Sequence, residues 1–199
     1  MKAILGLNFF FLYFPIIALI AFSFNDSKRN IVWKGFTFKY YIKAFNNESL
    51  HSAFLNSLIV ASISMVVSTI LGTMLGLALY RYRFPGKSAY DGFAHLPIMI
   101  PEICLGVAML AFFSLANIPL GLTTITVSHI AFTIPFVAVV IRARMAGFDI
   151  SLEEASYDLG GNQWQTFWNV TFPYLKPGIV AGSLLAFTLS IDDFVITFF

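Results

Sequence analysis

Three carboxylates lie inside apolar stretches of this chain, where a charge is costly to bury. Glu102 follows Pro101 in one apolar run, and Asp192 and Asp193 are neighbours near the end of another. Acidic side chains within membrane-spanning helices usually face the interior of a helix bundle, where they mark a pathway for a cation or a proton. We therefore take these three acids as candidates for a substrate pathway or gate.

Each acid also has a purely structural interpretation. In a helix over residues 178–199, Asp193 shares one face with small and polar residues, namely Ser183, Ala186, Ser190 and Thr197. Such a face lines a pathway or meets a partner subunit, but an aspartate there could equally cap a broken helix or pair with a basic group on another subunit. For Glu102, capping the helix after the proline break is the alternative to contact with a cation. His129 has no second metal-binding group at suitable spacing, so we expect a hydrogen bond between helices.

A polar segment over residues 149–178 separates two apolar runs. Ser151 and Glu154 have the spacing of a capping box at the start of a helix, and Gly160–Gly161 predicts its end in a left-handed turn. Asn162 with Gln165 predicts a second start. An aromatic stripe follows at Trp164, Phe167, Trp168 and Phe172, and Pro173 predicts that the helix stops there. The segment is thus expected to be a short helix–turn–helix at a membrane surface, with an amphipathic connector in the headgroups as the alternative.

Within this segment one motif resembles a known family. Glu154-Ala155-Ser156, then Gly160, then Val170-Thr171-Phe172-Pro173 resembles the EAA loop of bacterial ABC-importer permeases. The family pattern is Glu-Ala-Ala, three residues, Gly, nine residues and Ile-x-Leu-Pro, so the spacing is kept. In that family the loop is the coupling helix that docks into a cleft on the cytoplasmic ATPase. The resemblance implies that the coupling residues are Glu154, Ala155, Ser156, Asp158, Gly160 and Pro173.

The resemblance extends over nearly the whole chain, and one branch is especially similar. The chain resembles the second permease subunit of spermidine/putrescine importers in three stretches. These are Tyr80-Arg81-Tyr82-Arg83-Phe84 before Gly86-Lys87, Gly147-Phe148-Asp149 and Ser190-Ile191-Asp192-Asp193. This implies a permease subunit that moves a polyamine across the cytoplasmic membrane by alternating access. An importer of another small solute is the alternative.

The same resemblance implies the partners and cofactors. The partners are a sister permease subunit, a cytoplasmic ATPase dimer and an extracytoplasmic substrate-binding protein. ATP and magnesium belong to the ATPase, and we expect no cofactor, metal or catalytic site on this chain. Gly86-Lys87-Ser88 does not make a phosphate-binding loop, because Arg81 stands where that motif requires its first glycine.

Composition independently places the chain in the membrane. Hydrophobic residues make up 58% and charged residues 11%, and the mean hydropathy is +0.81, which indicates an integral membrane protein in contact with lipid. The net charge of +2 is too small to suggest nucleic-acid binding. The single cysteine, Cys104, excludes an intramolecular disulfide, and we expect it to be a buried packing thiol.

Five apolar runs predict five spans in a single permease domain over residues 1–199. The runs cover residues 3–24, 54–79, 93–116, 123–141 and 178–199, and Pro97 and Pro101 interrupt the third. Gly72 and Gly76 have GxxxG spacing, which predicts close helix packing. The predicted fold is an all-α polytopic membrane bundle of the type I ABC-importer permease kind. Such permeases usually have six spans, and the apolar end at Phe198–Phe199 leads us to expect a sixth that is missing by truncation.

Basic residues do not decide the orientation. With a cytoplasmic N-terminus, the inside residues are Lys2, Arg81, Arg83, Lys87, Arg142, Arg144 and Lys176, and the outside residues are Lys28, Arg29, Lys34, Lys39 and Lys43. The four arginines of the inside set flank span ends, where the positive-inside rule weighs most. The resemblance decides the matter, since residues 149–178 must face the ATPase, and it implies a cytoplasmic N-terminus.

Two other classes of function fit less well. An intramembrane aspartyl protease needs two carboxylates from different spans that share a proton, whereas Asp192 and Asp193 are neighbours. A membrane scaffold without transport explains the spans and the small-residue faces. It leaves the spacing of Glu154, Gly160 and Pro173 unexplained.

Overall fold

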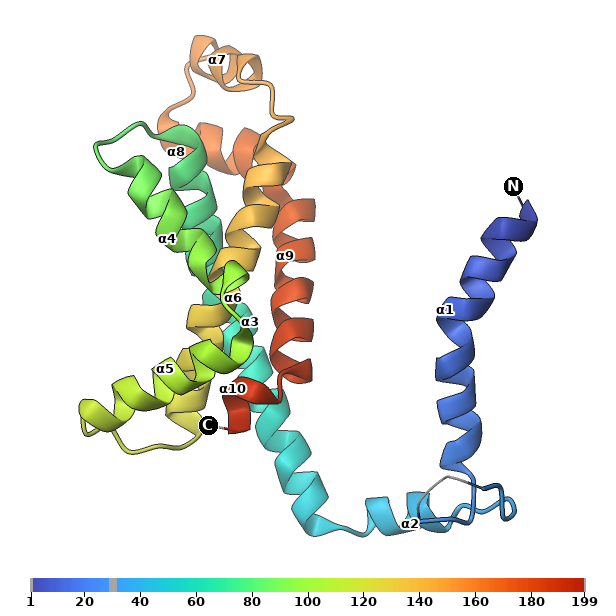
Figure 1. Cartoon of the computed structure of the whole chain (residues 1–199). Coiled ribbons are helices and arrows are strands. Elements are labelled where there is room, and N and C mark those ends of the chain that lie inside the picture. The colour runs from blue at the N-terminus through green and yellow to red at the C-terminus, as the bar shows by residue number, and fades with distance from the viewer. Residues whose placement is uncertain (1, 29–31, 199) are drawn as a thin grey trace. The chain divides into compact units, whose positions relative to one another are not determined.

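The computed structural model describes residues 2–28 and 32–198, which form two units (Figure 1). Unit 1 is Met1–Leu55 and unit 2 is Asn56–Phe199, so the boundary lies inside one long helix. Arg29 of the basic loop and the terminal Phe199 lie outside the described residues. Within those residues all regular structure is helical, apart from one isolated antiparallel bridge between Asn25 and Phe36. The all-α prediction is therefore confirmed.

Unit 1 contains the first predicted span, α1 (Lys2–Ser23), and a short helix, α2 (Lys39–Phe45). A helix of 22 residues is roughly 33 Å long, enough to cross a hydrocarbon core of about 30 Å. The loop between the helices is organised by Asn25, which is 1% exposed. Its amide donates to Val32 O (2.9 Å), and its carbonyl oxygen accepts from Lys34 N–H (2.7 Å).

The second span is α3 (Glu48–Arg81), which begins earlier than the predicted Phe54. The side chain of Asn47 accepts from Leu50 N–H (3.2 Å) and thereby satisfies a free donor at the start of the helix. Gly72 and Gly76 belong to a face of small residues that is buried in unit 2, together with Ala61, Ser64 and Ser68.

At the centre of unit 2, α6 (Leu122–Met145) packs between α3 and α9 (Phe172–Asp192). A Cβ at Gly72 would lie only 2.6 Å from Val137 Cβ and 2.9 Å from Ile134 O, so α3 approaches α6 where no side chain fits. A Cβ at Gly182, on α9, would lie 3.2 Å from Val137 Cγ1. The close packing predicted from the GxxxG spacing is confirmed. The buried core comprises Val137, Ile141, Met145, Phe148, Leu175 and Ala186.

The third span is broken, as its prolines predict. Helices α4 (Lys87–Met99) and α5 (Glu102–Leu115) meet at an angle of 109°. Ile100, which precedes Pro101, has an extended backbone because the proline ring disfavours a helical residue before it. The start of α4 contacts the end of α6 through Asp91 and Arg142, whereas the end of α5 lies beside the start of α6. The pair thus joins the two ends of α6, and with the pair taken as one bent span the described residues contain up to five spans.

The fifth span differs from its prediction at both ends. Gln163–Asp192 is one continuous helix of 30 residues, made of α8 (Gln163–Thr166), the π-helical turn η1 (Phe167–Thr171) and α9. The predicted stop at Pro173 and start at Gly178 are therefore wrong. In η1 the N–H of Phe172 donates to Phe167 O, five residues back, and this wider turn directly before Pro173 lets the helix continue. At its other end the helix stops at Asp192, and a short helix, α10 (Val195–Phe198), follows.

Candidate coupling site and candidate pathway site

The segment that resembles a coupling loop begins with the short helix α7 (Ser151–Asp158), at one end of unit 2 (Figure 1). The predicted capping box of Ser151 and Glu154 is wrong, because Ile150 already has helical dihedrals and Ser151 lies inside the helix. Asp149 takes over as the cap, and its carboxylate accepts from Ser151 N–H (3.0 Å). Hydrogen bonds from the Ser151 side chain and backbone hold the pKa of Asp149 below its usual range.

The end of α7 is formed as its glycines predict. Gly160 has a φ of +84°, in the left-handed region that L side chains rarely adopt. Gly161 N–H donates to Ser156 O (2.9 Å), and a Cβ at Gly161 would lie 2.8 Å from that oxygen. Glycine is therefore favoured at position 160 by its backbone conformation and required at position 161 by the lack of space.

The next helix starts at the predicted capping box. Gln165 N–H donates to Asn162 Oδ1 and Asn162 N–H donates to Gln165 Oε1, both at 2.9 Å. The aromatic stripe is confirmed as a cluster of neighbouring rings, with centroids 4.8–6.4 Å apart, at Trp164, Phe167, Trp168 and Phe172. The Trp164 side chain is 70% exposed, so the cluster extends to the surface of the chain.

Most of the predicted coupling residues are on the surface. Exposed positions are Glu154, Ala155, Asp158, Gly160 and Pro173, whereas Ser156 is half-buried and hydrogen-bonds to Thr166 Oγ1 (2.9 Å). An open groove runs between α7 and the start of the next helix, lined by Leu152, Ala155, Leu159, Gly160, Gln165 and Val170 among others. Leu159 is 90% exposed beside it. The α7 surface therefore combines exposed apolar and acidic side chains.

Sequence reasoning missed the role of Glu153, the one buried residue of α7. Its carboxylate accepts from the guanidinium of Arg81, at the end of α3, and from the hydroxyl of Thr171, in η1. Arg81 Nη2 also lies 3.4 Å from Thr171 Oγ1. We call Glu153, Arg81 and Thr171 the Glu153 cluster. The available signal was the helical period, which puts Glu153 on the same face as Ser156 and about 100° around the helix from the exposed Glu154.

At the other end of the long helix, a second acid is buried. Asp193 has an extended backbone, and its side chain, 2% exposed, accepts from Ile196 N–H (3.1 Å) and lies 3.3 Å from His129 Nε2. His129 also hydrogen-bonds through Nδ1 to Ser190 Oγ (2.7 Å) and through Nε2 to Thr197 Oγ1 (3.0 Å). We call Asp193, His129, Ser190 and Thr197 the Asp193 cluster. The interhelical hydrogen bond expected of His129 is confirmed.

The three predicted pathway acids do not form one site. The expected continuous helical face through Asp193 is wrong, because the backbone breaks there and the side chain caps α10. Asp192 is exposed, although it is the adjacent residue. Glu102 is exposed in the first turn of α5, without a side-chain hydrogen bond or ion pair in the described part of the chain. Two of the three carboxylates are thus open at the surface of the isolated chain.

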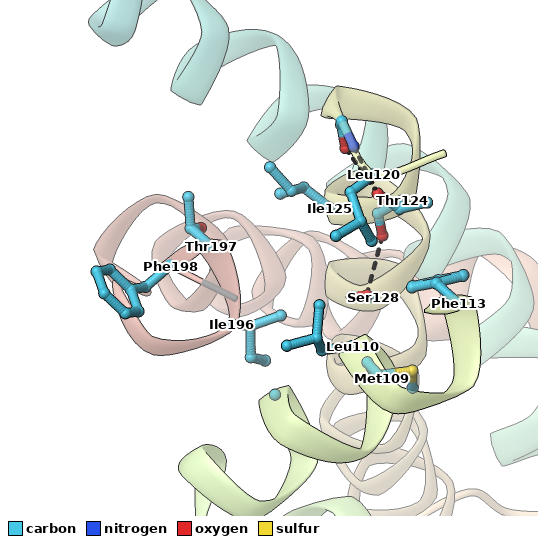
Figure 2. Close-up of a pocket in the computed structure, with 12 residues that line it drawn as sticks. Met109, Leu110, Phe113, Leu120, Thr124, Ile125, Ser128, Ile196, Thr197 and Phe198 are labelled. Atoms are coloured by element: carbon cyan, nitrogen blue, oxygen red, sulfur yellow. Dashed lines mark hydrogen bonds between the residues drawn. The ribbon is translucent and has the colours of Figure 1, made fainter. Parts of the chain in front are cut away.

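A small pocket of about 100 Å³ lies next to the Asp193 cluster, between α5, α6 and α10 (Figure 2). Thr124 and Ser128 line it, but their hydroxyls donate to Gly121 O (2.8 Å) and Thr124 O (2.9 Å) within α6. Apolar side chains complete the lining, among them Leu110, Phe113 and Ile196. Ligand pockets are typically about 300–1,000 Å³, so this space is too small to hold a substrate by itself.

Cys104 is exposed on α5, so the expected buried thiol is wrong. The apolar run around Cys104 has no polar face. Composition therefore could not show whether the Cys104 side chain points into the bundle or outward, because a lipid-facing surface is as apolar as a core.

These elements define a polytopic helical membrane protein with a short exposed helix at one end of its bundle. The chain belongs to the family of binding-protein-dependent transport system inner membrane components, since residues 68–199 match that family. It is therefore a multi-pass inner membrane protein of a transport system.

Individual relatives agree with this assignment. The spermidine/putrescine transport system permease protein PotC of Escherichia coli K12 is 41% identical over 189 residues, which cover 95% of this chain and 72% of the relative. PotC of Haemophilus influenzae is 39% identical over 95% of this chain and 74% of its own length. The putrescine transport system permease protein PotI of Escherichia coli K12 is 37% identical over 98% of this chain and 72% of its own length.

The fold is also that of a solved transporter. The crystal structure of a bacterial ABC transporter involved in the import of the acidic polysaccharide alginate matches with a TM-score of 0.70. The match covers 93% of this chain and 71% of the other at 18% identity, which establishes a shared fold. The predicted ABC-importer permease fold is confirmed.

Proposed function

We propose that this chain is the permease subunit of an ATP-driven importer that moves a polyamine, spermidine or putrescine, into the cytoplasm by alternating access. The observation that carries the proposal is the exposed helix α7, which presents Glu154, Ala155 and Asp158 at one end of the bundle. The polyamine assignment rests on the relatives, which are spermidine/putrescine and putrescine permease proteins.

The proposed partners follow from the family. A cytoplasmic ATPase dimer binds the α7 surface, hydrolyses ATP with magnesium and drives the cycle. A sister permease completes the pathway, and an extracytoplasmic binding protein delivers the substrate. The α7 end of the bundle then faces the cytoplasm, and we propose that the N-terminus does so too.

The proposed pathway uses the acids in different ways. A polyamine carries two or more positive charges at neutral pH, and it needs carboxylates or aromatic faces to replace its lost water. The exposed Asp192 and Glu102 are free to meet a cation. Asp193 is engaged with His129 and α10, so we propose that it controls the helix break beside the pathway and acts as a gate.

Uptake of radiolabelled spermidine by cells that express the whole transporter tests this proposal. Asp192→Asn, Asp193→Asn and Glu102→Gln each keep the side-chain shape and remove the charge. Loss of one charged hydrogen bond of about 1.5–3 kcal/mol predicts at least a tenfold loss of uptake for a residue that handles the substrate. Co-purification of the ATPase should survive in all three variants. Near-normal uptake in all three would show that this subunit's acids do not handle the substrate.

Cysteine labelling tests the orientation. In a Cys104→Ala background, cysteines at Ser88 and Gln163 should react with an impermeant reagent only after the inner membrane is opened. A cysteine at Asn46 should react in intact spheroplasts. All three positions are exposed, so accessibility across the membrane decides the result. The opposite pattern would place α7 outside and remove the proposed contact with the ATPase.

A further inference from the structure

Helix α7 is attached to the bundle through polar contacts. It has eight residues, too few to be stable alone, so its position depends on contacts with the rest of the chain. No apolar side chain of α7 is buried within the chain, and its one buried residue is Glu153. The helix is therefore fixed by polar contacts rather than by a hydrophobic face.

Those contacts reach two different helices. The Glu153 carboxylate accepts from Arg81, in the last turn of α3, and from Thr171, in the π-helical turn that leads into α9. Ser156 adds a hydrogen bond to Thr166, but this joins α7 only to the helix that directly follows it. Arg81 thus supplies the one side-chain link from α7 to α3 among the described residues.

The neighbouring arginines provide a contrast. Arg142 pairs with Asp91 and joins α6 to α4, and Arg144 donates to Tyr174 O (3.0 Å) and lies over the Tyr174 ring, joining α6 to α9. Both join helices that also pack side by side. The Glu153 cluster instead joins the spans to a short surface helix whose one buried side chain is Glu153 itself.

We propose that the Glu153 cluster transmits force from the docked ATPase to α3 and α9, with Glu153 and Arg81 as positioning residues. This inference rests on the proposed function. When the ATPase moves α7, the carboxylate carries α3 and the start of the long helix with it. Without that link, α7 moves with its partner while α3 lags behind, because only Ser156 and Thr166 then join α7 to the long helix. Glu154, the adjacent exposed acid, contacts the ATPase and has a separate role.

Reconstituted transporter, with the sister permease, the ATPase and the binding protein, provides the test. Spermidine uptake and ATP hydrolysis are measured together in proteoliposomes. Glu153→Gln and Arg81→Gln should keep the bound ATPase and its hydrolysis, while the transport achieved per ATP falls roughly tenfold, as for a charged hydrogen bond lost. Arg81→Lys retains the charge and should restore most of that ratio.

Arg83→Gln is the matched control. Arg83 lies two residues beyond Arg81, is exposed and has no side-chain hydrogen bond or ion pair in the described residues, so its loss should leave the ratio unchanged. Glu154→Gln should instead lower the amount of ATPase that co-purifies. A transport-to-ATP ratio within twofold of wild type in both Glu153→Gln and Arg81→Gln would overturn the proposal. An equal fall of the transport-to-ATP ratio in Arg81→Lys and Arg81→Gln would also overturn it, because the positive charge at position 81 would then have no effect.

A spin label separates failure of this inference from failure of the proposed function. In a Cys104→Ala background, a nitroxide on a cysteine at Leu159, which is 90% exposed, reports the mobility of α7. Glu153→Gln should increase that mobility, and Arg83→Gln should not. This holds whatever the substrate is, so absence of spermidine uptake by the wild-type transporter would reject the polyamine assignment alone. An unchanged spectrum in Glu153→Gln would reject the role of the Glu153 cluster.

Discussion

Two buried carboxylates, Glu153 and Asp193, hold opposite ends of the same long helix in different ways. The Glu153 side chain is 11% exposed and pairs with Arg81, which is 32% exposed and always charged. The Asp193 side chain is 2% exposed and lies against His129, which is 1% exposed and whose charge depends on its protonation. The first pair joins a surface helix to the bundle, and the second fixes a break inside it.

This difference in burial separates a contact that links moving parts from one that stabilises the fold. A partly solvated ion pair contributes little net stability, so its loss affects the link between the helices more than the stability of the fold. A fully buried pair is costly to separate, because each polar group then lacks water as well as its partner. We therefore expect substitutions at the Asp193 cluster to lower stability as well as uptake, and substitutions at the α7 end to affect mainly coupling.

The largest expected effect is that of His129→Ala. It removes the imidazole from beside the buried Asp193 carboxylate and from its hydrogen bonds to Ser190 and Thr197, and each buried polar group left without a partner costs about 1–3 kcal/mol. Thermal unfolding of the purified transporter in nanodiscs should shift down by several degrees. His51→Ala is the control, since His51 is exposed on α3. Equal melting temperatures for the two variants would mean that the Asp193 cluster does not stabilise the fold.

A smaller effect is expected from Gly160→Val. A β-branched residue resists the φ of +84°, and the left-handed conformation costs roughly 1–2 kcal/mol for an L residue. The turn after α7 should distort, and uptake should fall about tenfold while the protein remains in the membrane. Asn tolerates this conformation, so Gly160→Asn should retain most uptake. If Gly160→Val transports and binds the ATPase normally, α7 is not the coupling element.

The smallest effect is expected from Asn162→Ala, which removes one side of the capping box. Loss of an N-cap costs about 1 kcal/mol, and here it affects only the start of the long helix. The melting temperature should fall by a few degrees at most, less than in His129→Ala. Asn46→Ala, at an exposed position after α2, serves as the control. If Asn162→Ala lowered the melting temperature more than His129→Ala does, the α7 end of the long helix would contribute more stability than the Asp193 end.

Apart from the capping box predicted at Ser151 and Glu154, local signals in the sequence predicted local structure well. Gly160 and the pair Asn162 and Gln165 each specify a cap through residues that are close in the chain, and both were confirmed. The same holds for Gly72 and Gly76, whose spacing puts them on one helix face. The apolar runs located the long helices for a similar reason, since bilayer thickness sets their length.

The failures involve contacts that are distant in sequence or depend on one backbone detail. Pro173 predicts a stop, but a π-helical turn accommodates it, and no residue pattern marks that turn. Asp193 has a helical pattern on both sides, and the break follows from its contacts with His129, far away in the chain. Arg81 and Glu153 are 72 residues apart, so their pairing could not be deduced from spacing.

The continuous helix from Gln163 to Asp192 has a mechanical consequence. Its 30 residues form a rod of roughly 45 Å that starts beside α7 and ends at the Asp193 break. A tilt of about 5° at the α7 end displaces the far tip by roughly 4 Å over that length. Any rotation imposed near Thr171 therefore produces its largest displacement at Asp192. This residue lies next to the backbone break at Asp193, where the chain can change direction.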